Sequence, residues 1–289
     1  MKQFAGKTAV ITGAASGIGR GIAEWCVHEK VRVVLADMDE AALCAAGDEL
    51  KALGAEVLCV PTDVSKREEI ETLAQKAFDT FGGVHLLFNN AGVAAGGAPW
   101  EATWNDWEWV LGVNLWGVIH GVKAFTPRMM AQNTACHIVN TASCAGLMAG
   151  GSSAPYSVSK HAVVALSESL YLTLEQRRSL VKVSVLCPGM VRTNISNAES
   201  HRPERLRDET RPVSAAMQAG RGTFEALIAA GMPPAQVAKI VFDAIRKEQF
   251  YILTEAKWME AIRLRTERLM VMENPENPSA VLGTILKHA

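Results

Sequence analysis

The stretch that decides the fold runs from Lys7 to Gly19: KTAVIT (7–12) followed by GAASGIG (13–19). Its first half is a short apolar run with β-branched residues, which is typical of a buried strand. Its second half has glycines at 13, 17 and 19, and helical periodicity continues from there to about Lys30. Glycines at such a turn let the backbone approach a pyrophosphate, and the helix N-terminus presents free N–H groups to it. The stretch therefore predicts a dinucleotide-binding turn, although its spacing is not Gly-x-Gly-x-x-Gly.

The same alternation of apolar runs and helical stretches continues along the chain. Alternating strands and helices predict βαβ units, whose parallel strands all end at one edge of the sheet. The expected fold class is α/β, a doubly wound Rossmann-type parallel sheet with helices on both faces. Strands are expected at 7–12, 31–37, 56–63, 84–90, 136–143, 181–189 and 249–254, and the longest helices at about 104–132 and 155–178.

We expect a single catalytic domain over 1–289, because no linker or internal repeat divides the chain. The segment 194–233 is polar in its first half and long for a connection, so it is expected to form a substrate lid. Within it, the Arg-rich stretch 202–211 is balanced by acidic residues and is expected to be a solvated loop. Residues 255–289 are expected to form a C-terminal helical extension.

Composition excludes several classes of function. The net charge of −1 gives no reason to expect nucleic acid or a membrane surface as a partner. The six cysteines form no Cys-x-x-Cys pair, and the histidines form no ligand-spaced set, so no metal is expected. Reduced cysteines, no apolar run long enough to span a bilayer and no signal-peptide pattern at the N-terminus together predict a cytoplasmic protein.

Asp37 ends the second expected strand, a little under twenty residues after Gly19. A carboxylate there can accept hydrogen bonds from adenosine ribose hydroxyls and would repel a 2′-phosphate. The next residue is Met38 rather than a cation, so NAD is favoured over NADP as the cofactor. The alternative role for Asp37 is a helix N-cap, which Asp39 could serve equally well.

Four motifs occur in order: TGAASGIG (12–19), NNAG (89–92), YSVSK (156–160) and Pro188-Gly189. With them the chain resembles the main single-domain branch of the short-chain dehydrogenase/reductase family, over about residues 5–193. Two departures are Asn-Thr-Ala (140–142), in place of a serine-rich run, and His85 where the family often has Asp.

The resemblance implies roles for particular residues. The catalytic set would be Asn114, Ser143, Tyr156 and Lys160. The cofactor would be bound by Gly13, Ser16, Gly17, Ile18, Gly19, Asp37, Asp63, Val64, Asn90, Ala91, Gly92, Tyr156, Lys160, Pro188, Gly189, Val191 and Thr193. Within that list the resemblance implies that Asp63 and Val64 flank the adenine and that Thr193 contacts the nicotinamide amide.

Tyr156 and Lys160 are four residues apart on an expected helix, so they share a face. A free tyrosine has a pKa of about 10, and lowering it by about three pH units requires about 4 kcal/mol. A neighbouring ammonium and a positive nicotinamide ring both favour the phenolate. Ser143 would steady the substrate oxygen, and Asn114 would hold a water that connects Lys160 to solvent.

The expected function is an oxidoreductase that transfers hydride between NAD(H) and a secondary alcohol or ketone. The alternatives are an NADPH-dependent ketoreductase, opposed by Asp37, and a non-catalytic dinucleotide-sensing protein on the same fold. Apolar residues near the site predict a bulky apolar substrate, aryl, alicyclic or lipid-like, unless they pack against the protein body or another subunit. These residues are Trp100, Leu147, Met148, Met190, Met217, Phe224, Leu227, Ile228 and Met232.

Five of the seven tryptophans lie between Trp100 and Trp116, in the expected helix 104–132 or just before it. An aromatic stripe of this kind is typical of a core or a subunit interface. Family members usually pack the two long helices against symmetry mates, so a homodimer or homotetramer is expected.

Overall fold

The computed structural model describes residues 1–150, 153–208 and 215–277. Its described residues form a seven-stranded sheet in the order β3-β2-β1-β4-β5-β6-β7, in which all neighbours are parallel. Strand order reverses between β1 and β4, which leaves a crevice at their carboxyl ends. The predicted doubly wound α/β fold is therefore confirmed. The strands are β1 (Thr8–Thr12), β2 (Arg32–Asp37), β3 (Val57–Pro61), β4 (Leu86–Asn89), β5 (Cys136–Thr141), β6 (Val181–Cys187) and β7 (Tyr251–Leu253).

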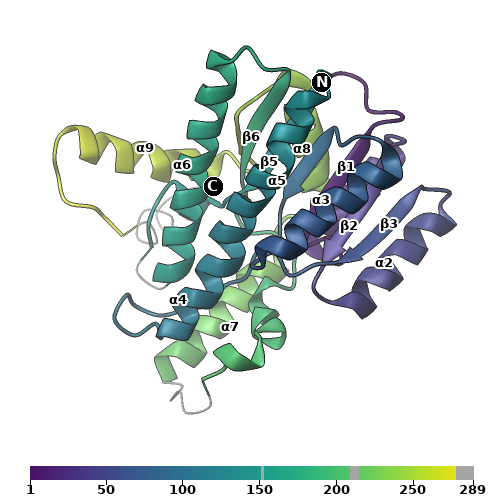
Figure 1. Cartoon of the computed structure of the whole chain (residues 1–289). Helices are drawn as coiled ribbons and strands as arrows, with labels where there is room; N and C mark the ends of the chain where they lie inside the picture. Colours follow the sequence, from purple (N-terminus) through teal and green to yellow (C-terminus); the bar gives the residue numbers. More distant parts are fainter. Residues whose placement is uncertain (151–152, 209–214, 278–289) are drawn as a thin grey trace.

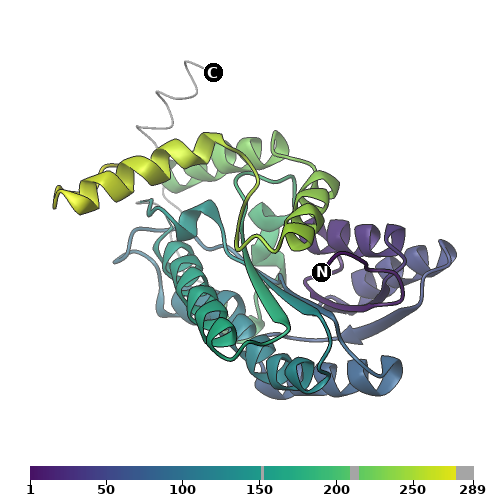
Figure 2. The same ribbon diagram turned by 90° about the horizontal axis from the view of Figure 1, so that it is seen from above.

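Helices cover both faces of this sheet (Figures 1 and 2). One core cluster joins α1, α2 and α8 to the face that carries Val33 and Leu35. The other joins α3, α5 and α6 to the face that carries Val34 and Ala36. Successive β2 side chains thus enter opposite cores, as the two-residue period of a strand requires. The helices are α1 (Gly17–His28), α2 (Glu40–Ala52), α3 (Arg67–Phe81), α4 (Trp104–Leu111), α5 (Gly117–Ala131), α6 (Ala154–Gln176), α7 (Ala215–Ala229), α8 (Pro234–Lys247) and α9 (Lys257–Met270).

The stretch expected as one helix over 104–132 is interrupted. A five-residue π-helical turn, Gly112–Trp116, separates α4 from α5, and it contains Asn114. Such turns are frequent at functional sites, since they change which side chains face a neighbour. Periodicity cannot reveal the interruption, because one wider turn barely changes the spacing of apolar residues.

The segment expected as a lid has structure of its own. It contains 3-10 turns at Ile195–His201 and Glu204–Leu206, and then α7. Residues 209–214 and the side chain of Met217 lie outside the described part, as do residues 278–289 of the expected C-terminal extension. In the described part of that extension, α9 projects from the body of the molecule (Figures 1 and 2).

The expectation that 202–211 is a solvated loop is wrong for Arg202. Its side chain is only 3% exposed, and it forms an ion pair with the fully buried Asp106 of α4. A charged side chain is buried at acceptable cost only when it is paired and hydrogen-bonded. Charge balance along the sequence does not reveal which of several arginines is paired in that way.

Candidate active site

The glycine-rich turn sits at the carboxyl end of β1, against the strand-four loop. Gly13 adopts a φ of +65°, and a Cβ there would lie 2.8 Å from Cα of Ala91. A Cβ on Gly19 would lie 2.0 Å from the Gly13 carbonyl oxygen. Ser16 precedes α1 in an extended conformation, and its side chain does not cap the helix. The N-terminus of α1 therefore offers backbone N–H groups in a cradle that Cβ atoms would fill, which fits a pyrophosphate.

The same turn is joined to residues far along the chain. A Cβ on Gly17 would lie 3.0 Å from Cγ2 of Thr193, so the loop after β6 packs directly on the turn. Ile18 is partly buried and packs on the core beneath α1. The loop after β6 is also fixed by a β-bridge between Val191 and Met232.

The Asp37 carboxylate lies beside the glycine turn. It accepts hydrogen bonds from the backbone N–H of Ala15 at 3.0 Å and of Asp39 at 3.2 Å. Asp39, not Asp37, caps α2, because its side chain accepts from the Ala42 N–H. The cap role is therefore filled by the neighbour, and Asp37 is held at the end of β2, where a ribose would lie. The Met38 side chain beside it is 42% exposed.

Asp63 and Val64 follow β3 at the same edge. The Asp63 carboxylate accepts from both the backbone N–H and the hydroxyl of Ser65, at 3.0 and 2.7 Å. Val64 is buried, and its side chain fills the space where a Cβ on Gly117 would lie. The Val64 carbonyl oxygen is 3.0 Å from Nδ1 of His120. These contacts fix the loop against α5.

Thr12 joins the two strands at the point where strand order reverses. Its hydroxyl accepts from the backbone N–H of Asn90 at 2.9 Å and of Ala91 at 3.1 Å, and donates to the Phe88 carbonyl. A Cβ on Gly92 would lie 3.4 Å from both Oδ1 of Asn114 and Nζ of Lys160. The predicted cofactor loop thus borders the predicted catalytic residues.

The four predicted catalytic residues come together at the carboxyl edge of the sheet. Ser143 follows β5, Tyr156 and Lys160 lie on α6, and Asn114 lies on the π-helical turn. The Ser143 hydroxyl lies near the Tyr156 phenol and acts to lower its pKa. Lys160 donates from Nζ to the carbonyl of Thr141 at 2.9 Å, and its Nζ lies 5.6 Å from the centre of the Tyr156 ring.

Asn114 is buried, and both N–H groups of its side-chain amide are hydrogen-bonded. Oδ1 accepts from the Val93 N–H at 2.8 Å, and Nδ2 donates to the Val93 carbonyl at 2.9 Å and to the Ser159 hydroxyl at 3.1 Å. Ser159 in turn donates to the Tyr156 carbonyl at 2.7 Å. The side chain therefore has no N–H left for a water, and it joins the strand-four loop to α6.

Burial governs ionisation at this site. It lowers the pKa of Lys160 to about 8, because the ammonium is only 3% exposed. Burial raises the pKa of Tyr156, and the Ser143 hydroxyl acts in the opposite direction. Burial also raises the pKa of Cys144 well above its ordinary value, so this thiol next to Ser143 is not an activated nucleophile.

The Pro188-Gly189 turn after β6 is held from behind by α9. The Gly189 N–H donates to the Thr254 hydroxyl at 3.1 Å, and a Cβ on Gly189 would lie 2.0 Å from Nε1 of Trp258. Pro188 accepts from the Cys144 N–H at 2.9 Å, which ties this turn to the serine loop. Sequence reasoning missed Trp258, since an amphipathic helix carries no signal of what its apolar face contacts.

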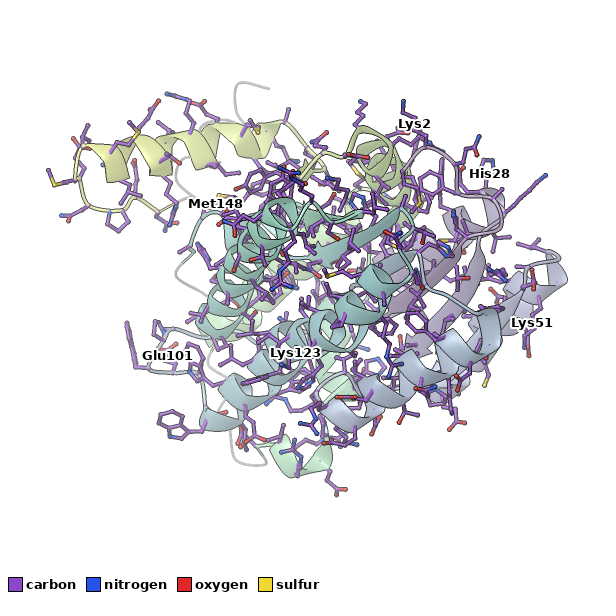
Figure 3. All side chains as sticks on the ribbon, turned by 45° about the horizontal axis from the view of Figure 1, so that its top comes forward. Lys2, His28, Lys51, Glu101, Lys123 and Met148 are labelled. Atoms are coloured by element: carbon purple, nitrogen blue, oxygen red, sulfur yellow. The ribbon has the colours of Figure 1, made fainter. Side chains whose placement is uncertain are left out.

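The predicted apolar lining divides into several groups. Met148 lies at the base of α9, where it forms a cluster with Trp258, and Met190 packs against that cluster (Figure 3). Trp100 is 84% exposed and Leu227 is 46% exposed, whereas Ile228 is buried. Leu147 packs on the core beneath α6, Phe224 is partly buried, and Met232 packs on the core beneath α1.

A groove of about 480 Å³ lies along α4, and none of the four predicted catalytic residues lines it. Its walls come from α4, the π-helical turn, residues 203–206, and Met38, Asp63 and Ser65 from the expected cofactor side. The predicted tryptophan stripe contributes Trp104, Trp107, Trp109 and Trp116 to it. Trp104 and Trp116 are 88% and 53% exposed, and Trp109 is buried.

Among residues 1–150, 153–208 and 215–277, no group of His, Cys, Asp and Glu side chains is arranged to hold a metal ion. Nor does any helix in that part of the chain have the length and apolarity needed to cross a membrane.

The model of the short chain dehydrogenase family matches residues 7–204. This chain is a short-chain dehydrogenase. It belongs to a family of oxidoreductases, and the predicted resemblance is confirmed.

Solved and curated relatives extend beyond the matched region. A short-chain dehydrogenase/reductase from Burkholderia phymatum, solved in complex with NAD, is 48% identical, with a TM-score of 0.94 and coverage of 96% of this short-chain dehydrogenase and 99% of that chain. The CLA biosynthesis dehydrogenase/reductase of Lactiplantibacillus plantarum is 35% identical over 96% of this chain and 97% of its own. The 1-deoxy-11-beta-hydroxypentalenate dehydrogenase of Streptomyces exfoliatus is 35% identical over 90% and 86%.

Proposed function

We propose that this short-chain dehydrogenase transfers hydride between NAD(H) and a bulky, largely apolar secondary alcohol or ketone. The observation that carries the proposal is the convergence of Ser143, Tyr156 and Lys160 beside the glycine turn. A proton-transfer group and a dinucleotide cradle at one sheet edge are what hydride transfer requires.

The choice of NAD rests on charge. The Asp37 carboxylate is oriented by two backbone N–H groups at the end of β2, where it can accept from ribose hydroxyls and repel a 2′-phosphate. The NAD complex of the Burkholderia phymatum relative supports the same choice. The alternative of an NADPH-dependent ketoreductase would place a phosphate against this carboxylate.

The residues of this chain then divide the proton chemistry. NAD, when bound, accepts or supplies the hydride. Tyr156 takes the hydroxyl proton from the alcohol, and Ser143 donates a hydrogen bond that steadies the substrate oxygen as charge develops on it. Lys160 has its Nζ 5.6 Å from the centre of the Tyr156 ring, and with a pKa of about 8 it remains mostly protonated at pH 7. Together with the positive nicotinamide ring, this ammonium would oppose the burial that raises the pKa of Tyr156.

Asn114 also has a structural role, beside the water contact that the family resemblance implies. Its amide is engaged with Val93 and Ser159, so we assign it the task of holding the π-helical turn against α6.

The apolar substrate class is supported by the walls near the catalytic serine. Met190 is partly exposed there and packs on the buried Met148 and Trp258, and its thioether surface favours apolar ligands. The Streptomyces exfoliatus relative is named a dehydrogenase of 1-deoxy-11-beta-hydroxypentalenate, which is a hydroxylated compound, and this name is consistent with alcohol oxidation. A non-catalytic dinucleotide sensor is opposed by the assembled catalytic residues, which such a sensor does not need.

The test is a panel of alcohols assayed with NAD by NADH absorbance, comparing 1-phenylethanol and cyclohexanol with 2-propanol and glycerol. Catalytic efficiency is expected to rise with apolar size, since each buried methylene contributes up to about 0.8 kcal/mol. A preference for glycerol would contradict the apolar pocket. NADH binding without turnover of any alcohol would favour the sensor.

A further inference from the structure

The segment Ile195–Leu206 is fastened to α4 through a buried arginine. Arg202 donates to Asp106 at 2.6 Å, to both oxygens of Glu199 at 2.8 Å and to the Leu206 carbonyl at 3.2 Å. Its guanidinium also lies 4.3 Å from the centre of the Trp109 ring. Asp106 is fully buried, so the ion pair holds together two segments that are far apart in the sequence. Removing one partner of such a pair leaves a buried charge without compensation.

The first turn of α4 supplies the other half of this fastening. Asp106 and Thr103 form a capping box, in which Asp106 accepts from the Thr103 N–H while its other oxygen accepts from Arg202. The Thr103 hydroxyl and the Asn105 amide both donate to Asp208, at 2.6 and 2.8 Å. The segment is therefore attached to the start of α4 at both Arg202 and Asp208, and Figure 1 shows α4 and α7 at the same end of the molecule.

The fastened segment covers the loop beside the catalytic residues. Ala198 and Leu206 pack with Val93, Ala95 and Trp109 in one buried cluster. Both backbone groups of Val93 are bonded by the Asn114 amide, as described above. The Ala95 carbonyl accepts from the hydroxyl of Ser153, the residue before α6. The segment thus rests on a loop that is tied to Asn114 and to the start of the helix carrying Tyr156.

We propose that Arg202 is a positioning residue that fixes 195–208 on α4 as a rigid wall of the substrate site. The inference rests on the proposed function and deepens it. Within the segment expected as a lid, residues 195–208 stay docked on α4. Arg202 acts on substrate binding through the wall and contacts neither substrate nor cofactor.

A neighbouring ion pair provides a matched control. Arg205 and Glu108 join the same segment to the same helix, but their side chains are 65% and 58% exposed. Exposed pairs contribute little to stability, because water screens them. Glu108→Gln breaks this pair and keeps Arg205 and Arg207 in the sequence, so the same trypsin cleavage sites can be compared in all variants.

The experiment compares wild type, Arg202→Met, Arg202→Lys and Glu108→Gln. Steady-state assays vary 1-phenylethanol at saturating NAD, NADH fluorescence titration gives the Kd, and limited trypsin digestion measures cleavage after Arg205 and Arg207. In Arg202→Met we expect the KM for 1-phenylethanol to rise at least tenfold, the NADH Kd to stay within twofold and cleavage to be at least tenfold faster. Arg202→Lys retains the charge but loses the several N–H donors of the guanidinium, so its KM and cleavage rate should lie between those of wild type and Arg202→Met. Glu108→Gln should match wild type in both.

Each contrary result has a distinct meaning. Unchanged tryptic cleavage in Arg202→Met overturns the fastening, with or without turnover. Faster cleavage with an unchanged KM overturns the role as a substrate wall. A parallel loss of NADH affinity would show a general structural defect and overturn the positioning role. If wild type oxidises no alcohol of the panel, the proposed function fails, and the cleavage and NADH titrations still decide the fastening.

Discussion

The Asp37 carboxylate accepts a hydrogen bond from the backbone N–H of Ala15 at 3.0 Å, so the residue proposed to bind the ribose is joined directly to the glycine turn. A second bond from Asp39 orients the other oxygen. Backbone groups on both sides therefore set the position of the carboxylate.

Cofactor preference should follow this residue. Asp37→Ser with Met38→Arg removes the carboxylate and adds a cation that can pair with a 2′-phosphate. We expect the ratio of kcat/KM for NADP to that for NAD to rise at least a hundredfold. Asp37→Asn, which keeps the size and can retain the Ala15 bond, should shift the ratio less. An unchanged ratio in the double variant would show that the ribose is read elsewhere.

Tyr156→Phe should abolish turnover, because the phenol is the proposed proton acceptor. The expected loss in kcat is at least about a hundredfold, the usual lower size of such effects. NADH affinity should stay within a few-fold of wild type in a fluorescence titration. Retention of more than about a hundredth of the rate would contradict the general-base assignment.

Gly19→Ala should disrupt the cradle, since its Cβ would lie 2.0 Å from the Gly13 carbonyl oxygen. That oxygen belongs to the backbone and cannot swing aside. We expect NADH affinity to fall at least tenfold and the melting temperature to fall as well. Gly222→Ala is the control, because a Cβ there meets no atom within 4 Å. Equal NADH affinity in both variants would count against a pyrophosphate at this turn.

Burial of Lys160 predicts a pH-dependent stability. Its pKa falls from 10.5 to about 8 on folding, so between these values the unfolded chain binds more protons and stability rises with pH. Burying the charged ammonium lowers the unfolding free energy, and this destabilisation fades as the pH rises through the folded-state pKa of about 8. Relative to Lys160→Met, the unfolding free energy of wild type should rise by about 1 kcal/mol from pH 7 to pH 9. Urea titrations of both proteins at the two pH values measure this, and parallel changes would show an unperturbed lysine.

The expected homodimer or homotetramer has its own test. Trp104 on α4 and Trp116 on the π-helical turn are largely exposed. Exposed aromatic side chains of this kind are typical of a surface that another subunit covers. Light scattering at low micromolar concentration should give two or four times 31.1 kDa. A mass near that of one chain would contradict the prediction.

The cytoplasmic location is likewise a prediction, which fractionation of the source cells would test.

The sequence by itself determined the features that depend on neighbouring residues. Short continuous apolar runs predicted the strands, helical periodicity predicted the helices, and parallel βαβ units followed from their alternation. Tyr156 and Lys160 could be paired because residues four apart on any helix share a face. The glycine turn was recognisable because only glycine tolerates a backbone contact such as that between Gly19 and Gly13.

Only the tertiary structure decided which distant residues meet. The sequence around an arginine looks the same whether its side chain is solvated or buried. The ion pair between Arg202 and Asp106 is therefore visible only once the segment is seen packed on α4. Trp258 behind Gly189 is a second case, because the partner of an amphipathic face is set by the whole fold. The π-helical turn at Asn114 is a third, since its amide must reach Val93 and Ser159 at once. Contacts of this kind depend on how elements pack in space, and local periodicity carries no record of that.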